Sequence, residues 1–135
     1  MELLFLTVEN ILRFHQDQIE RYGGNANVRD MGLLESAAAM PMASFGSHYI
    51  AHDIYEMAAA YLFYIVMNHP FVDGNKRTGA VSAYIFLRIN GIVLTAAEDE
   101  FADLALQVAS GKKGKEDVVS FLRINCIAIE DSDCI

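Results

Sequence analysis

The longest unbroken apolar run of the chain, MAAAYLFYIVM at 57–67, is the feature that most restricts its fold. A membrane-spanning helix needs about 20 such residues, so a run of 11 residues predicts a helix buried in a globular core. A second apolar stretch, AVSAYIFL at 80–87, predicts another helix that is surrounded by others. Between them lies NHPFVDGNKRTG, 68–79, the densest cluster of polar and basic side chains. Burying such groups is costly unless each finds a partner, so this segment is expected to have a function.

Capping and helix-breaking residues divide the rest of the chain into short helices. Thr7 can cap a first helix, whose inward positions are apolar except for His15. Asp53 can cap the helix that carries the long apolar run, and Pro70 prevents its continuation. Helices are expected over 8–22, 32–40, 53–68 and 75–89, from a capping box at 95–98 to about 108, and over 115–128.

The remaining segments leave little room for β-structure. Residues 41–52 predict a loop or a small hairpin, and 92–94 could form a short strand beside 2–6. The acidic end of the chain, 130–135, is expected to fray. No repeat or linker interrupts the sequence, so the fold class is all-α: one compact helical bundle over 1–135, with at most a short β-hairpin.

Composition excludes several classes of partner. The net charge of −8 and the lack of a basic stripe argue against direct binding of nucleic acid. Cys126 and Cys134 have no metal-ligand spacing and predict no disulfide framework, which fits a reducing cytoplasm. The beginning of the chain, MELLFLTVEN, has an acidic residue where a signal peptide has positive charge. We therefore expect a cytoplasmic protein that binds neither nucleic acid nor membranes.

The polar segment combines three chemical functions. Lys76 and Arg77 begin a helix, where free backbone N–H groups and the helix dipole already favour anions, and Gly74 lets a ligand approach the backbone. Asp73 would repel phosphate unless a cation such as Mg²⁺ lay between them. His69 has a side chain suited to accept a proton at neutral pH. A base, a metal-binding carboxylate and a phosphate site together predict metal-assisted phosphoryl or nucleotidyl transfer.

Other interpretations of these residues remain. His69, Asp73 and Arg77 could merely stabilise a helix–helix turn, with His69 on a carbonyl group and Arg77 paired with Asp73. His48 and His52, spaced i to i+4, could bind zinc with His69 as a third ligand, although two exposed loop histidines explain them as well. The spacing in GNKRT excludes a phosphate loop of the GxxxxGK[ST] kind.

The segment HPFVDGNKRT resembles the signature of the Fic/Doc superfamily, written HxFx[D/E]GN followed by basic residues. RYGG at 21–24, NVRDMGLLESA at 27–37 and FLRINGI at 86–92 are similar to the small Doc-type (death-on-curing) toxins of toxin–antitoxin systems. The resemblance implies a Fic-like helical fold, with ATP and Mg²⁺ as cofactors. It implies His69 as general base, Asp73 as the Mg²⁺ ligand, and phosphate contacts from Gly74, Asn75, Lys76 and Arg77.

Two positions separate this chain from the larger Fic proteins that transfer AMP. In the larger Fic proteins that this segment resembles, a glycine stands at the position of Lys76 and a second arginine at the position of Ala80. The Doc-type toxins share the NKR version, which implies transfer of the ATP γ-phosphate to a Ser or Thr hydroxyl of a translation factor similar to elongation factor Tu. Transfer of AMP and a catalytically silent binding module are the alternatives.

The family pattern also implies how the activity is controlled. Ser44, Phe45 and Gly46 fall where the family has a flap that aligns the target, although an ordinary surface hairpin is an equally good interpretation. The inhibitory motif [S/T]xxxE[G/N] is missing, since Glu9-Asn10 has Phe5 four residues before the glutamate. A toxin without this motif predicts a separate antitoxin, whose segment folds over the active-site cleft on binding.

Overall fold

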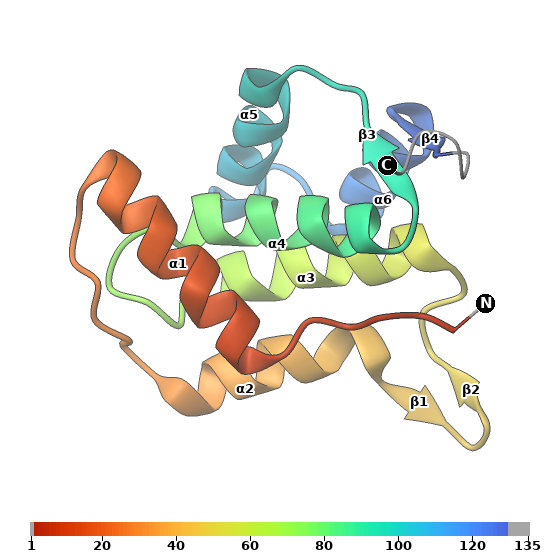
Figure 1. Ribbon diagram of the computed structural model, residues 1–135, viewed down its shortest axis with the longest axis horizontal. Coiled ribbons are helices and arrows are strands. Elements are labelled where there is room, and N and C mark those ends of the chain that lie inside the picture. The colour runs from red at the N-terminus through yellow and green to blue at the C-terminus, as the bar shows by residue number, and fades with distance from the viewer. Residues whose placement is uncertain (1, 130–135) are drawn as a thin grey trace.

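The computed structural model describes residues 2–129 as six α-helices and two small β-sheets (Figure 1). This confirms the expected mostly helical class. The elements are α1 (Val8–Tyr22), α2 (Met31–Ala39), the 3₁₀ helix η1 (Met40–Met42), β1 (Ser44–Phe45), β2 (His48–Tyr49), α3 (Ile54–Asn68), α4 (Asn75–Ile89), β3 (Ile92–Leu94), α5 (Glu98–Ala109), α6 (Lys115–Ile124) and β4 (Cys126–Ala128). The expected fraying at 130–135 lies outside the described residues.

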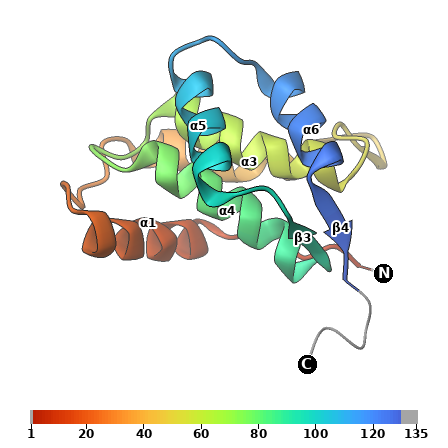
Figure 2. The same ribbon diagram turned by 90° about the horizontal axis from the view of Figure 1, so that it is seen from above.

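Helices α3 and α4 form the centre of the molecule and pack against each other more extensively than any other pair. Helix α1 packs across α4, α2 packs on α3, and α5 and α6 cover the opposite side (Figures 1 and 2). Helix α3 is the most buried helix, as its long apolar run predicts. None of the helices within residues 2–129 has the length and apolar character needed to cross a membrane.

A glycine on α4 permits the close approach of the two central helices. A Cβ atom at Gly79 would lie 3.1 Å from the carbonyl oxygen of Leu62 and 3.1 Å from Cγ2 of Val66, both on α3. Real Cβ atoms rarely have such short contacts, so a larger residue would push α3 and α4 apart. Gly79 therefore sets the spacing of the helices that flank the polar segment.

The chain before α1 is held by side chains instead of by a neighbouring strand. Tyr61 accepts a hydrogen bond from the N–H of Leu6 at 2.9 Å, and burial raises the pKa of Tyr61 to about 12. The side chain of Asn90 bonds both the N–H and the carbonyl of Leu4, at 2.9 Å each. The side-chain amide of Asn90 thus takes the place of a neighbouring strand as the hydrogen-bond partner of the Leu4 backbone.

Three expectations about the C-terminal half are wrong: the partner of the strand at 92–94, the end of the last helix and the capping box at 95–98. The strand β3 pairs antiparallel with β4 and not with 2–6, so the last helix ends at Ile124 and 126–128 are extended. Helix α5 begins after Ala97 without a side-chain cap, because the hydroxyl of Thr95 donates instead to the carbonyl of Asn125 at 2.8 Å. The β3–β4 pairing brings these two residues together across 30 positions of sequence.

Candidate active site

The polar segment forms the turn between α3 and α4, at one end of the molecule (Figure 1). Helix α3 ends at Asn68, and His69 follows in the left-handed conformation with φ 52° and ψ 54°. Among residues 2–129, His69 is the one non-glycine residue with positive φ. Gly74 precedes α4 with φ 82°, which glycine adopts without steric cost. The turn therefore places an exposed histidine five residues before Gly74, the N-cap of α4.

The beginning of α4 has the properties of an anion site. Within residues 2–129, the backbone N–H groups of Gly74, Asn75, Lys76 and Arg77 have no hydrogen-bond acceptor. The side chains of Lys76 and Arg77 are exposed, and the guanidinium of Arg77 lies 4.7 Å from the ring centroid of Tyr22. Free N–H groups, the helix dipole and two cations would all attract phosphate to this point.

The side chain of Asn75 bonds the backbone of the turn on both sides of its amide. Its Oδ1 accepts from the N–H of Phe71 at 3.0 Å, and its Nδ2 donates to the carbonyl of Phe71 at 2.9 Å. Asn75 is only 5% exposed, so its amide fixes the turn from inside. Any contact between Asn75 and phosphate would have to come from its backbone N–H.

Asp73 is exposed and keeps one carboxylate oxygen free of protein hydrogen bonds within the described chain. Its other oxygen, Oδ2, accepts from the N–H of Asn25 at 2.8 Å. No ion pair joins Asp73 to Arg77 in residues 2–129. The interpretation that Arg77 pairs with Asp73 to stabilise the turn is therefore wrong. The free oxygen of Asp73 can bind a cation.

Residues of α1 and of the connection between α1 and α2 hold the turn in place, and the sequence motif does not contain them. His15 of α1 stacks on Phe71 with ring centroids 3.7 Å apart, and its Nε2 lies 2.7 Å from the carbonyl oxygen of Asp73. Arg29 donates to the carbonyl groups at the end of α3. The one available signal was His15, which the sequence places among apolar residues on the inward face of α1 and which is buried there.

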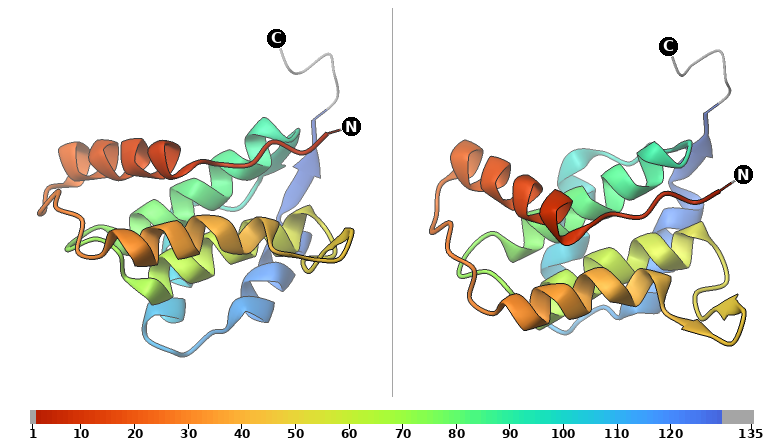
Figure 3. Two further views of the ribbon diagram at one scale, coloured as in Figure 1. Left: turned by 90° about the horizontal axis from the view of Figure 1, so that it is seen from below. Right: turned by 60° about the horizontal axis from the view of Figure 1, so that its bottom comes forward.

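The structure does not bring the expected flap to His69. Ser44, Phe45 and Gly46 do lie in a β-hairpin, but this hairpin precedes the first turn of α3, whereas His69 follows the last. A helix of 15 residues is about 22 Å long, and Figure 3 shows the hairpin and the α3–α4 turn at opposite ends. The interpretation of this hairpin as a flap over His69 is therefore not supported.

The same separation argues against the zinc site. His48 and His52 lie at the hairpin end of α3, far from His69. His52 is exposed, and its Nδ1 is 3.4 Å from the carboxylate of Glu56. Within residues 2–129, no three His, Cys, Asp or Glu side chains lie close enough together to hold a metal ion.

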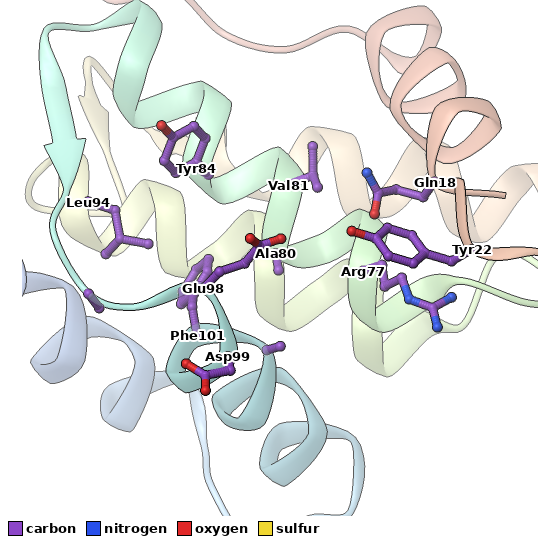
Figure 4. A pocket seen from close by; sticks show the side chains of 12 residues that line it. Gln18, Tyr22, Arg77, Ala80, Val81, Tyr84, Leu94, Glu98, Asp99 and Phe101 are labelled. Carbon is purple, nitrogen blue, oxygen red and sulfur yellow. The ribbon is translucent and has the colours of Figure 1, made fainter. Parts of the chain in front are cut away.

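A pocket of about 820 Å³ adjoins the beginning of α4, between α1, α4 and α5 (Figure 4). Tyr22 and Arg77 lie at one end, and Glu98 and Asp99 of α5 lie across from them. The walls are largely apolar and include Ala80, Val81, Leu94, Phe101 and Ala102. A ligand or peptide in this pocket would lie directly beside the anion site.

Comparison with known proteins agrees with this arrangement. The profile of the Fic/DOC family matches residues 5–87, which include α1 to α3, the complete turn and α4 as far as Leu87. The chain is 42% identical over 91 residues to a protein named Toxin Doc from Mycolicibacterium smegmatis, covering 66% of this chain and 70% of that protein. It is 34% identical over 118 residues to Protein kinase doc of Escherichia phage P1, covering 87% of this chain and 92% of the relative. The chain belongs to the Fic/DOC family.

Proposed function

We propose that the protein is a Doc-type toxin that transfers the γ-phosphate of ATP to a Ser or Thr hydroxyl of a target protein. The observation that carries this proposal is the turn in which His69 precedes, by a few residues, four free N–H groups and the cations of Lys76 and Arg77. The names of the relatives, one a toxin and one a protein kinase, support the same reaction. The target in this proposal is a translation factor similar to elongation factor Tu.

In the proposed reaction His69 takes the proton of the target hydroxyl. A bond forms between the hydroxyl oxygen and the γ-phosphorus, while the bond from the γ-phosphorus to the oxygen bridging the β- and γ-phosphates breaks. ADP leaves with the electron pair of that bond, and the proton stays on His69. The N–H groups of α4, with Lys76 and Arg77, would stabilise the negative charge on the phosphate oxygens.

The residues present fit a magnesium ion. Asp73 offers one free carboxylate oxygen, and Mg²⁺ is usually held by one or two carboxylates together with phosphate oxygens and water. Such an ion would neutralise charge on the phosphates when ATP is bound. Asn25 orients the carboxylate of Asp73 through its 2.8 Å hydrogen bond.

Control by an antitoxin is part of the proposal. The pocket beside Arg77 is largely apolar, as the binding groove of an amphipathic helix usually is. A segment of the antitoxin that folds into this pocket would lie across the route to the beginning of α4. Both the phosphate site and the target would then be blocked.

The decisive experiment uses ATP labelled in either the α- or the γ-phosphate. Purified protein is incubated with Mg²⁺ and a cell extract, and labelled proteins are then detected. Label from the γ-position alone supports phosphate transfer, label from the α-position means AMP transfer, and label from neither refutes a transferase. His69→Ala should abolish labelling and growth arrest while circular dichroism stays unchanged, and His52→Ala is the matched control at an exposed histidine.

The role of Asp73 needs a separate variant. Asp73→Asn keeps an oxygen that can accept from Asn25 but loses the negative charge. We expect unchanged thermal stability, a transfer rate lowered roughly a hundredfold, and a higher Mg²⁺ concentration for half-maximal rate. A variant with the Mg²⁺ dependence of the wild type would exclude Asp73 as the metal ligand.

A further inference from the structure

Three donors of Arg29 bond three successive carbonyl groups of the turn. Its backbone N–H donates to the carbonyl of Pro70 at 2.7 Å, Nε donates to that of His69 at 2.7 Å, and Nη2 donates to that of Asn68 at 2.9 Å. Arg29 lies about 40 residues earlier in the chain, in the connection between α1 and α2. One residue from a separate segment thus fixes the backbone on both sides of His69 and at His69 itself.

The left-handed backbone conformation of His69 explains why these hydrogen bonds are needed. A non-glycine residue in the left-handed region is held there only when its surroundings enforce it. The last carbonyl groups of a helix also lack partners within the helix and carry partial negative charge. The guanidinium of Arg29 supplies both the hydrogen bonds and the positive charge at the end of α3.

The rest of the same segment strengthens the contact. The N–H of Asp30 also donates to the carbonyl of Pro70, at 3.0 Å, and the N–H of Val72 donates to the carbonyl of Asn27 at 3.1 Å. Val28 and Phe71 form an isolated antiparallel bridge between these two segments of the chain. This pairing brings the Arg29 side chain to the end of α3.

We propose that Arg29 is the positioning residue of His69, holding its backbone in the left-handed conformation from which its imidazole reaches the reacting hydroxyl. This inference rests on the proposed function only for the role of His69 as base. Arg29 itself touches neither ATP nor the target in this proposal. Loss of Arg29 should therefore slow the chemical step without weakening the binding of ATP.

The test compares Arg29→Ala with Arg21→Ala. The control removes a guanidinium from the same third of the chain, where it pairs with Asp17 on the surface at 2.9 Å. We expect kcat of Arg29→Ala to fall roughly ten- to a hundredfold, because small displacements of a catalytic group cost rates of this order. The KM for ATP should stay within about twofold of the wild type, since binding is not affected. Added methylguanidinium should restore part of the rate in Arg29→Ala and none in Arg21→Ala.

A second measurement does not depend on the reaction. In protein labelled with ¹³C-histidine, the ring signal of His69 should shift or broaden in Arg29→Ala and not in Arg21→Ala. An unchanged His69 signal in Arg29→Ala overturns the proposal, and so does a changed signal with kcat equal to that of Arg21→Ala. If the wild type transfers no label, the proposed function fails, and the His69 signal alone decides on Arg29.

Discussion

The ring of His15 lies parallel to the ring of Phe71, at an interplanar angle of 6° and a centroid distance of 3.7 Å. The Nε2–H of His15 donates to the backbone carbonyl of Asp73 at 2.7 Å. His15 is only 2% exposed, so the neutral ring is part of the core beneath the turn. A side chain that looks like a misplaced polar residue in α1 thereby connects this helix to the candidate active site.

Replacing His15 by Phe should test this connection. His15→Phe keeps a ring that can stack on Phe71 but leaves the carbonyl of Asp73 without its donor. We expect the free energy of unfolding in urea at pH 8 to fall by about 1–3 kcal/mol. His48→Phe, at an exposed histidine of the hairpin, should change it by less than about 0.5 kcal/mol. An equal effect of both substitutions would contradict the role of His15.

The stability of the wild type should depend on pH through the same residue. Burial, the largest influence, lowers the pKa of His15, against the hydrogen bond and the charge of Asp73, which raise it. The unfolded chain therefore takes up a proton near the ordinary pKa of about 6.5, before the folded chain does. Stability should be highest above that pH and fall as the pH is lowered towards the pKa of folded His15.

Because His15→Phe cannot titrate, its disadvantage relative to the wild type should become smaller below pH 6.5. Urea unfolding of both proteins between pH 5 and 8 measures this difference directly. A difference that is constant over this range would show that His15 titrates alike in the folded and unfolded chains.

Asn75 and Lys76 are neighbours in sequence with separable roles. Asn75→Ala would leave both the buried N–H and the carbonyl of Phe71 without partners, so we expect a loss of about 2–4 kcal/mol in unfolding free energy. Lys76→Ala, at an exposed position, should keep the stability but raise the KM for ATP. Urea unfolding and transfer kinetics of the two variants together check this division. A stable Asn75→Ala with a high KM would restore Asn75 as a phosphate contact.

Substitution in the pocket should separate toxicity from its control. Ala102 is an exposed pocket residue on α5, and Ala102→Arg would fill the pocket with a charged side chain. We expect phosphate transfer close to that of the wild type but at least about tenfold weaker binding of the antitoxin. Ala109→Arg on the same helix is the control, since Ala109 is exposed and does not line the pocket. Titration calorimetry with the antitoxin would decide, and equal affinities for the two variants would place the antitoxin elsewhere.

The helices could be predicted from the sequence because their limits depend on nearby residues. Asp53 caps α3 through a 3.0 Å bond to the N–H of Glu56, and Thr7 forms a capping box with Asn10, three positions away. The capping box expected at Thr95 was wrong for the opposite reason, because the partner of Thr95 is distant in sequence. Its hydroxyl bonds Asn125, a residue whose position depends on the folding of the whole C-terminal half.

In the candidate site too, features set by nearby residues could be predicted and contacts with distant residues could not. His69, Asp73, Lys76 and Arg77 could be proposed from the sequence because these four candidate residues lie within one short turn. The residues that orient them were missed, since Asn25, for example, lies 48 positions from Asp73. Nothing in a local sequence pattern indicates that a backbone N–H donates to a carboxylate across such a separation.

The close contact at Gly79 also has a consequence for the reaction. The proposed base follows the end of α3 and the proposed phosphate site begins α4, so the distance between them depends on the α3–α4 interface as much as on the loop. A methyl group at Gly79, 10 residues from His69 in sequence, would press on Leu62 and Val66 of α3 and so change the position of His69 relative to the proposed phosphate site. The distance between the proposed base and the proposed phosphate site thus depends on the lack of a side chain at Gly79.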